Sequence, residues 1–403
     1  MEHSIPDSAD PSIPLVTAAQ ALLSTTLKAP VHLTNMQHLT EAGRRNLIIR
    51  CTVAGAAPGQ PASVIIKHVV AEHYDPEATD SWDIQRFFRD WAGAEFLNAL
   101  SSESSYSPRF YGGDRAMGFI ILEDLGVHLS LVEPLLEGDA LRGEQAILAL
   151  ATQLGMLHAD TIGTAPHFEQ IVRAINPRTA VDVATACLQN ATELRTRAEH
   201  LRGHLDRLGV PLASRFADDI AAICTTIAHP GDFLAYVHGD PCPDNVFYTD
   251  GRLRLIDFEF GTFGHALQDG VYGRMMFPTC WCANQIPATL LERMEQVYRA
   301  ELVRGCPAAQ DDRIFAIAQA HLCGYWLIHT LARLLERGLD EDVIWGIATL
   351  RPRITARLQS FITTTTTANQ LPALRNTANA LLDYLHTRWP DTQPLALYPA
   401  FRL

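Results

Sequence analysis

The spacing of hydrophobic residues in the first third of the chain predicts a small antiparallel sheet with one helix. Two β-branched runs of strand length, "NLIIRCTV" (46–53) and "SVIIKHVV" (63–70), flank a segment rich in glycine and proline. Apolar residues then recur at helical spacing over 83–102. Two further strand-like runs follow, "RFYG" (109–112) and "GFIILEDL" (118–125). This order predicts strands that pair as hairpins and one helix that packs against them.

The pattern changes after residue 130, where apolar residues recur at helical spacing nearly everywhere. The helices are expected at 144–159, 180–208, 213–229, 287–304, 311–337, 341–361 and 372–388. The one strand-like interruption is a strand–turn–strand pattern at 237–260. We therefore expect an α+β protein with three parts. These parts are an N-terminal extension (1–30) with a short helix, a sheet-containing lobe (31–125) and a large helical lobe (126–403).

Composition narrows the possible partners and the compartment. The net charge of −13 argues against binding to nucleic acid, whose phosphates would repel the chain. The most apolar window, 314–335, is interrupted by glutamine and histidine, so we expect a buried core helix and no membrane association. Eight scattered cysteines without a C-x-x-C pair are expected to be free thiols of a reducing compartment. The acidic, proline-containing N-terminus does not resemble a secretory signal, and a cytoplasmic protein is expected.

Candidate chemistry is concentrated in "VHGDPCPDNVFYTDGRLRLIDFEF" (237–260). The Asp-Gly pair at 250–251 predicts a two-residue hairpin turn, so residues whose numbers add to 501 should face each other. Asn245 and Asp257 then meet at the open end of the hairpin. An amide oxygen and a carboxylate form a hard site of the kind that Mg²⁺ prefers. Asp240, on the loop that enters the hairpin, is a candidate to accept a proton from a substrate hydroxyl.

Two short segments carry a family resemblance. "HGDPCPDN" (238–245) followed by "LIDFEF" (255–260) resembles the catalytic loop and metal motif of the aminoglycoside phosphotransferase/choline kinase family. "HGD" in place of "HRD", and "IDFE" in place of "DFG", distinguish this family from protein kinases. The resemblance implies a bilobal protein-kinase-like fold, ATP or GTP as phosphoryl donor, Mg²⁺ and a hydroxylated small-molecule substrate.

The same resemblance implies a set of nucleotide-binding residues in the first lobe. Lys67, inside "SVIIKHVV", would contact the α- and β-phosphates, although a strand lysine taken alone more often reaches solvent. Glu95 would pair with Lys67, the alternative being a solvated helix face. Glu123 and Leu125 resemble the hinge that holds the adenine edge. Gly43 would belong to the nucleotide loop, which departs from the G-x-G-x-x-G pattern because it has a single glycine.

Four more residues have supporting or open roles. His238 is expected to orient the catalytic loop, and Asp269 resembles the aspartate that supports this loop from downstream. Glu259 is open between metal support and binding of a cationic substrate. Cys242 has no neighbouring base in the motif that would mark it as a nucleophile.

Three functions remain open from the sequence. The first is a kinase that phosphorylates an aminoglycoside or another antibiotic. The second is a metabolic kinase of choline, a hydroxylated amine or a sugar derivative. The third belongs to another class, a nucleotide-binding module without turnover, and is suggested by the glycine-poor loop.

Overall fold

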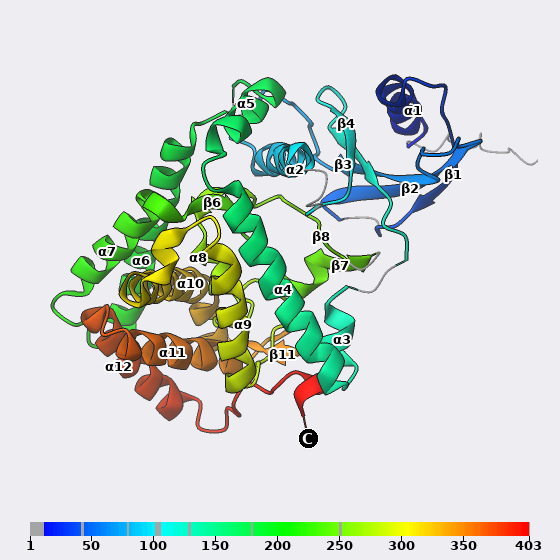
Figure 1. Cartoon of the computed structure of the whole chain (residues 1–403). Helices are drawn as coiled ribbons and strands as arrows, with labels where there is room; N and C mark the ends of the chain where they lie inside the picture. Colours follow the sequence, from blue (N-terminus) through cyan, green and yellow to red (C-terminus); the bar gives the residue numbers. More distant parts are fainter. Residues whose placement is uncertain are drawn as a thin grey trace, which may run out of the picture. The chain divides into compact units, whose positions relative to one another are not determined.

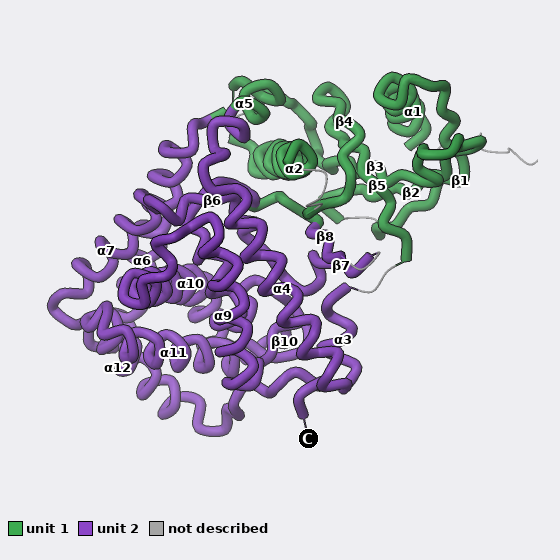
Figure 2. The backbone as a smooth tube through the Cα atoms, in the orientation of Figure 1, with its two compact units in different colours: residues 1–128, 170–180, 256–260 green, residues 129–169, 181–255, 261–403 purple. Residues whose placement is uncertain are grey.

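The chain divides into two compact units, which Figure 2 colours separately. A computed structural model describes residues 12–41, 44–78, 80–100, 106–127, 130–178, 180–249 and 252–402. Unit 1 comprises Met1–His128, Gln170–Ala180 and Ile256–Phe260. Unit 2 comprises Leu129–Glu169, Val181–Leu255 and Gly261–Leu403. The segment 256–260, which follows the predicted hairpin, therefore belongs to the first unit.

Unit 1 is an antiparallel five-stranded sheet with two helices (Figure 1). The strand order is β1-β2-β3-β5-β4. The elements are α1 (Ile13–Leu27), β1 (His32–His38), β2 (Asn46–Ala54), β3 (Ser63–Val69), α2 (Trp82–Ala99), β4 (Phe110–Asp114) and β5 (Phe119–Glu123). Four of the five strands and both helices coincide with the predicted ones, whereas β1 was not predicted. Most residues of β1 are polar and exposed, so it lacks the apolar alternation that marks a strand.

The two helices of unit 1 cover opposite faces of the sheet. A Cβ atom on Gly112 of β4 would contact Leu22 of α1, and one on Gly113 would overlap the ring of Trp91 of α2. Because neighbouring strand residues point to opposite faces, α1 and α2 lie on different sides. Leu15 and Leu23 of α1 are buried in one apolar cluster with residues of the sheet. The expected separate N-terminal extension is therefore wrong for α1, which belongs to the core of unit 1.

Unit 2 is mainly helical, with three two-stranded sheets. Its helices are α3 (Val132–Leu136), α4 (Ala140–Thr161), the first half of α5 (Ala165–Ile175), α6 (Val183–Leu208), α7 (Phe216–Ala228), α8 (Leu267–Gly270), α9 (Ala288–Leu302), α10 (Asp312–Asp340), α11 (Leu350–Thr367) and α12 (Pro372–Arg388). Its strands are β6 (Leu234–Val237), β7 (Val246–Thr249), β8 (Arg252–Leu255), β9 (Thr262–His265), β10 (Ile344–Trp345) and β11 (Ala348–Thr349).

Helix α10 runs through the interior of unit 2, where it packs against α6, α7 and α11 (Figure 1). Among the helices of the described residues, it alone has the length and apolar composition of a membrane span. However, 72% of its most apolar window is buried within the protein. Burial of this kind is typical of the core helix of a globular unit, which is the role expected from its interrupting glutamine and histidines.

The expected α+β architecture is confirmed, with a small antiparallel-sheet unit and a larger, mainly helical unit. Two details differ. The helix predicted at 341–361 begins only at Leu350, because the hairpin β10–β11 precedes it and turns at Gly346 with a φ of +65°. The helix also extends beyond residue 361 to Thr367, because the threonine run forms its last turns, where Thr364 and Thr365 are buried.

Candidate active site

The catalytic loop of unit 2 connects β6 to β7 and is held by a buried aspartate. After β6 ends at Val237, Gly239 adopts a φ of +77°, which glycine accepts without steric cost. Asp269 of α8 accepts hydrogen bonds from the backbone N–H of His238 at 2.6 Å and of Gly239 at 3.1 Å. The Nδ1 atom of His238 lies 3.3 Å from the N–H of Asp240. These bonds fix the backbone that carries Asp240.

Asp269 is held in turn by two residues that the sequence did not single out. His158 of α4 is fully buried, and its Nε2 atom lies 3.4 Å from Asp269 Oδ2. The Nδ1 atom of His158 lies 2.8 Å from the hydroxyl of Tyr298. Burial raises the pKa of Tyr298 well above its usual value, so this hydroxyl stays protonated. A histidine on the buried face of an apolar helix was the available signal for this contact.

The carboxylate of Asp240 accepts hydrogen bonds from two side-chain hydroxyls. Tyr272 donates to Asp240 Oδ1 at 2.7 Å, and Thr279 donates to the same oxygen. Burial, followed by the nearby charge of Asp240, raises the pKa of Tyr272 well above its usual value. Tyr272 therefore remains a donor at neutral pH. Both hydroxyls orient the candidate base through one oxygen, which leaves the other oxygen for a substrate.

The hairpin after the loop has the predicted register. Val246 pairs with Leu255, and Thr249 pairs with Arg252. The Asp-Gly turn itself lies outside the described residues. At the open end, the Nδ2 atom of Asn245 donates to the backbone carbonyl of Asp240 at 3.0 Å. This bond orients the amide so that its oxygen is the atom available for a metal ion.

In unit 1, Lys67 on β3 is paired with two carboxylates. Its Nζ atom lies 2.7 Å from Asp90 Oδ2 and 2.5 Å from Asp257 Oδ1. Burial alone would lower the pKa of Lys67, but the two carboxylates raise it above its usual value. Lys67 is therefore a fixed positive charge beside the candidate metal ligand Asp257.

The predicted pairing of Lys67 with Glu95 is wrong, because Asp90 takes that place. Glu95 accepts a hydrogen bond from the indole N–H of Trp91 at 2.8 Å. Five residues separate Asp90 from Glu95, which is about 140° around a helix. Only Asp90, which is 3% exposed, therefore faces Lys67.

Asp90 also fixes the segment that contains Asp257. Its Oδ1 atom accepts a hydrogen bond from the N–H of Phe258 at 2.8 Å. Asp257 has a φ of +68°, a left-handed conformation that aspartate tolerates better than most residues. Its side chain is 35% exposed, so it can be reached from solvent. A strained backbone and an accessible carboxylate are typical of a ligand-binding position.

Glu259 is occupied by partners within unit 1. One carboxylate oxygen forms an ion pair with Arg86 of α2, and the other accepts a hydrogen bond from Asn46 at 2.5 Å. Glu259 is also buried. Of the roles left open for it, neither metal support nor substrate binding fits this arrangement. Glu259 instead anchors its segment to α2 and β2.

The predicted hinge and nucleotide-loop residues are only partly described. Glu123 ends β5, and its N–H donates to the carbonyl of Arg109 at 2.7 Å. Its carboxylate accepts from the N–H of Arg109 at 2.9 Å. The N–H of Leu125 makes no hydrogen bond within the described part of the chain, so it is the available hinge donor. Gly43 lies outside the described residues.

Asp124, between the two predicted hinge residues, is fixed by a bidentate pair with Arg50 at 2.7 and 2.9 Å. Burial alone would raise the pKa of Asp124, but hydrogen bonds from Arg50, Ser63 and the backbone N–H of Gly126 lower it below its usual value. Asp124 is therefore ionised and closes the end of β5 against β2.

One disulfide joins the catalytic loop to the segment that carries Thr279. Cys242 and Cys280 are bonded, with Cα atoms 5.6 Å apart. The expectation that all eight cysteines are free is wrong for this pair, since a separation of 38 residues gives no pairing signal. The other six are buried thiols. Groupings of Asp240 or Asp244 with these sulfurs are not metal sites, because bonded sulfurs are not thiolate ligands.

The oxygens of Asn245 and Asp257 are chemically suited to Mg²⁺. The amide nitrogen of Asn245 is engaged by the protein, so its oxygen faces a cation, and Asp257 brings a carboxylate that is 35% exposed. Mg²⁺ typically takes one or two such protein oxygens and completes its shell with water and phosphate. Both residues therefore fit the ion that the resemblance implies.

Comparisons with known proteins agree with this chemistry. The model of the phosphotransferase enzyme family matches residues 83–304, more than half of the chain. A search of curated proteins found no match. The match to the family model includes Asp90, the catalytic loop and Asp269.

Several solved structures are similar at low sequence identity. Choline kinase from Cryptosporidium parvum Iowa II has a TM-score of 0.48 and 12% identity, covering 87% of this chain and 93% of that chain. A choline/ethanolamine kinase family protein from Mesorhizobium loti has a TM-score of 0.44 and 13% identity, covering 92% and 99%. The gentamicin complex of APH(2")-IIa has a TM-score of 0.43 and 15% identity, covering 92% and 99%.

Proposed function

The chain belongs to the phosphotransferase enzyme family and is a small-molecule kinase, and we propose that it transfers the γ-phosphoryl group of ATP or GTP to an alcohol. Asp240 receives the proton of the acceptor hydroxyl. The hydroxyl oxygen forms a bond to the γ-phosphorus while the bond between the γ-phosphorus and the β–γ bridging oxygen breaks. The products are a phosphate ester and a nucleoside diphosphate.

The observation that carries this proposal is the orientation of Asp240. Two protonated hydroxyls and a backbone fixed by Asp269 hold its carboxylate in one position. A preorganised acceptor of this kind is what positioning of an alcohol requires, because phosphoryl transfer depends on alignment more than on covalent chemistry.

The donor nucleotide is assigned to the residues of unit 1. Lys67, fixed by Asp90, supplies the positive charge for the α- and β-phosphates, and the N–H of Leu125 supplies a donor for the base. Asn245 and Asp257 would hold one Mg²⁺, which neutralises charge on the phosphates. The hairpin register supports this assignment. Val246 pairs with Leu255, and Asn245 directly precedes Val246 while Asp257 lies two residues after Leu255. A cytoplasmic location is part of the proposal, because that compartment supplies the nucleotide, but the Cys242–Cys280 bond does not agree with the free thiols expected there.

The candidate functions that the sequence leaves open differ in the class of alcohol that accepts the phosphoryl group. An aminoglycoside or another antibiotic would make the enzyme a resistance kinase. Choline, a hydroxylated amine or a sugar derivative would make it a metabolic kinase. A nucleotide-binding module without turnover remains the alternative of another class, and the preorganised Asp240 counts against it.

The test measures acceptor-dependent nucleoside diphosphate release by the wild type and by Asp240→Ala over a panel of alcohols. General-base catalysis contributes about 10²- to 10⁴-fold, so we expect a loss of at least about 100-fold with unchanged nucleotide affinity. Asp244→Asn is the matched control, because Asp244 lies in the same loop and accepts from the indole of Trp281. Nucleotide binding without Asp240-dependent turnover would instead identify a binding module.

A further inference from the structure

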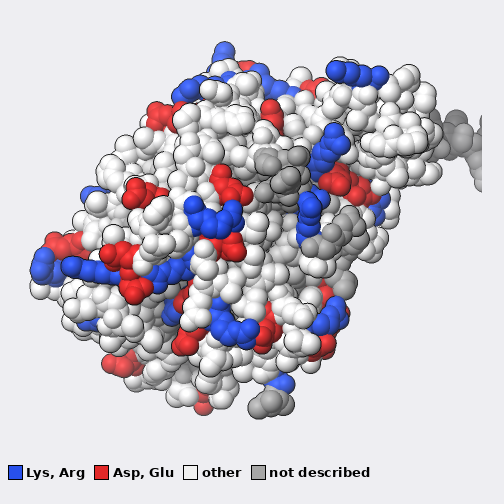
Figure 3. All heavy atoms as spheres, in the orientation of Figure 1, with Lys and Arg blue, Asp and Glu red and all other residues white. Residues whose placement is uncertain are grey.

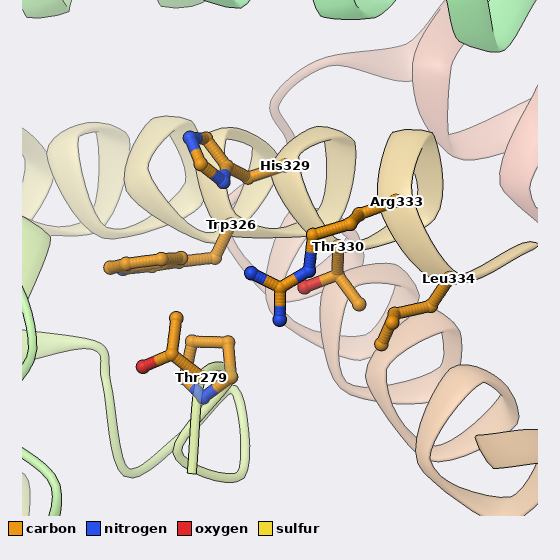
Figure 4. A pocket seen from close by; sticks show the side chains of 7 residues that line it. Thr279, Trp326, His329, Thr330, Arg333 and Leu334 are labelled. Carbon is orange, nitrogen blue, oxygen red and sulfur yellow. The ribbon is translucent and has the colours of Figure 1, made fainter. Parts of the chain in front are cut away.

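A small pocket in unit 2 adjoins the catalytic carboxylate. Its enclosed volume is about 10 Å³, enough for one small polar group, and the remaining space is open to solvent. Its lining comes from the segment after α8 and from α10, and consists of Pro278, Thr279, Trp326, His329, Thr330, Arg333 and Leu334 (Figure 4). Thr279 is the residue that donates to Asp240. A molecule in this pocket is therefore separated from the candidate base by one shared side chain.

Three polar side chains of the pocket have no hydrogen-bond or ion-pair partner among the described residues. They are His329, Thr330 and Arg333, which follow one another along α10. Thr330 is 5% exposed as a residue, and its hydroxyl faces the pocket. Figure 4 shows the guanidinium of Arg333 beside Thr330, on the side of the pocket that faces Trp326 and Thr279. Such groups are typical of a binding site whose ligand supplies the missing partners.

The pocket carries positive charge. None of its lining residues is acidic. Arg333 makes no ion pair within the described ranges, and its guanidinium lies 5.7 Å from the ring centroid of Trp345. His329 is neutral and adds no charge, because burial, followed by the charges of Arg197 and Arg333, lowers its pKa to about 3.

Two further arginines, both on α11, make no ion pair with a carboxylate among the described residues. Arg353 of α11 donates to the carbonyls of Cys280 and Trp281 at 2.7 and 2.8 Å. Arg357 donates to the carbonyls of Met275 and Met276 at 3.0 and 3.3 Å. Both are buried. Carbonyl oxygens accept from these guanidiniums without cancelling their charge, and Arg353 Nε and Arg357 Nη1 have no hydrogen-bond partner among the described residues.

The net charge of −13 belongs to the whole chain and does not determine the charge of the pocket. On the face drawn in Figure 3, basic and acidic side chains are interspersed. Burial, followed by the charge of Arg197, lowers the pKa of Arg333 below its usual value, while the charge of Asp240 acts in the opposite direction. In the proposed reaction, Asp240 binds the hydroxyl group of the acceptor, so it does not pair with Arg333.

We infer that the acceptor is an alcohol that also carries an oxyanion, a carboxylate or a phosphate, which binds Arg333 while the hydroxyl lies at Asp240. This inference rests on the proposed kinase function. His329 and Thr330 supply neutral hydrogen bonds to the remaining hydroxyls, and Trp326 supplies an apolar wall. The proton passes from the alcohol to Asp240, the phosphoryl group passes from ATP or GTP to the alcohol oxygen, and the oxyanion is unchanged. Choline and aminoglycosides would bring positive charge to Arg333 and are disfavoured.

The experiment compares four acceptor classes at equal concentration with ATP and Mg²⁺. The classes are hydroxy acids, sugar phosphates, neutral sugars and polyols, and cationic alcohols such as choline and gentamicin. Product is measured as phosphate ester by mass spectrometry. We expect turnover with one of the two anionic classes, and the two anionic arms distinguish a carboxylate from a phosphate.

Two arginine variants test the assigned contact. Arg333→Met should raise KM for the anionic acceptor about 10- to 100-fold, the range for losing a charge-assisted hydrogen bond, with kcat and nucleotide affinity retained. Arg333→Lys should recover part of the loss. Arg313→Met is the matched control, because Arg313 is an exposed arginine of the same helix outside the pocket.

The possible results test the acceptor class and the kinase function separately. Asp240-dependent phosphorylation of neutral or cationic alcohols alone, or an unchanged KM in Arg333→Met, would overturn the acceptor inference and leave the kinase function intact. Nucleotide binding without turnover in all four classes would overturn both. Thermal melts and nucleotide titration of each variant exclude misfolding as the cause of a changed KM.

Discussion

Replacement of Asp90 by asparagine tests the most specific feature of the nucleotide half. Asp90 is 3% exposed and bonds both Lys67 and the N–H of Phe258. Asparagine keeps an oxygen for the N–H of Phe258 but removes the charge that faces Lys67. The substitution therefore isolates the ion pair from the hydrogen bond.

The magnitude follows from the surroundings of Lys67. Removing one partner of a buried ion pair costs about 3–5 kcal/mol when the other charge is left alone. Lys67 retains Asp257 as a second carboxylate, and its side chain is 12% exposed. We therefore expect a smaller cost, about 2–3 kcal/mol. If the whole cost appears as weaker positioning of the nucleotide, kcat/KM for the nucleotide decreases about 30- to 150-fold.

The assay is steady-state kinetics with varied ATP, accompanied by thermal melts. Glu95→Gln is the control, because the amide oxygen can still accept from the indole of Trp91. We expect this variant to stay within about threefold of wild type, in line with surface changes below about 0.5 kcal/mol. A larger loss in Glu95→Gln than in Asp90→Asn would refute the assignment of Asp90 as the partner of Lys67.

Helix α2 illustrates what could and could not be predicted from the sequence. Periodicity predicted α2 correctly, yet it did not fix which acid faces the sheet. The helical rotation between Asp90 and Glu95 decides their roles, and that rotation depends on how Phe87 and Trp91 pack. An acid among large apolar residues of a helix was the available signal. The hairpin at 246–255, by contrast, was predictable to the residue because an Asp-Gly turn fixes its register.

Two other expectations concern pH and the disulfide. His265 is buried, and burial followed by the charges of His321 and His158 lowers its pKa to about 3. The unfolded chain then binds a proton below about pH 6.5 that the folded chain does not. His265 should therefore account for about 2 kcal/mol of the stability that is present at pH 7 and lost by pH 5, measured as the difference in unfolding free energy in urea between wild type and His265→Asn. A His265→Asn variant with an unchanged pH slope would contradict this. The Cys242–Cys280 bond links residues 38 positions apart. In the chain-entropy account, a bond that closes a loop of this length stabilises the folded state by up to about 4 kcal/mol. Dithiothreitol should therefore lower the thermal midpoint of wild type but not of a double serine variant, and equal midpoints would argue against the bond.

The position of Asp240 depends on residues far outside the catalytic motif. Met276 and Phe277 both have positive φ, an unfavourable backbone for side chains of this size. The carbonyls of Met275 and Met276 accept from Arg357, which holds that turn from α11. The turn carries Thr279, and Thr279 donates to Asp240. A chain that kept the loop sequence but lost these α11 contacts would keep the motif without the geometry. The functional unit is therefore the motif together with the turn and the helix that constrain it.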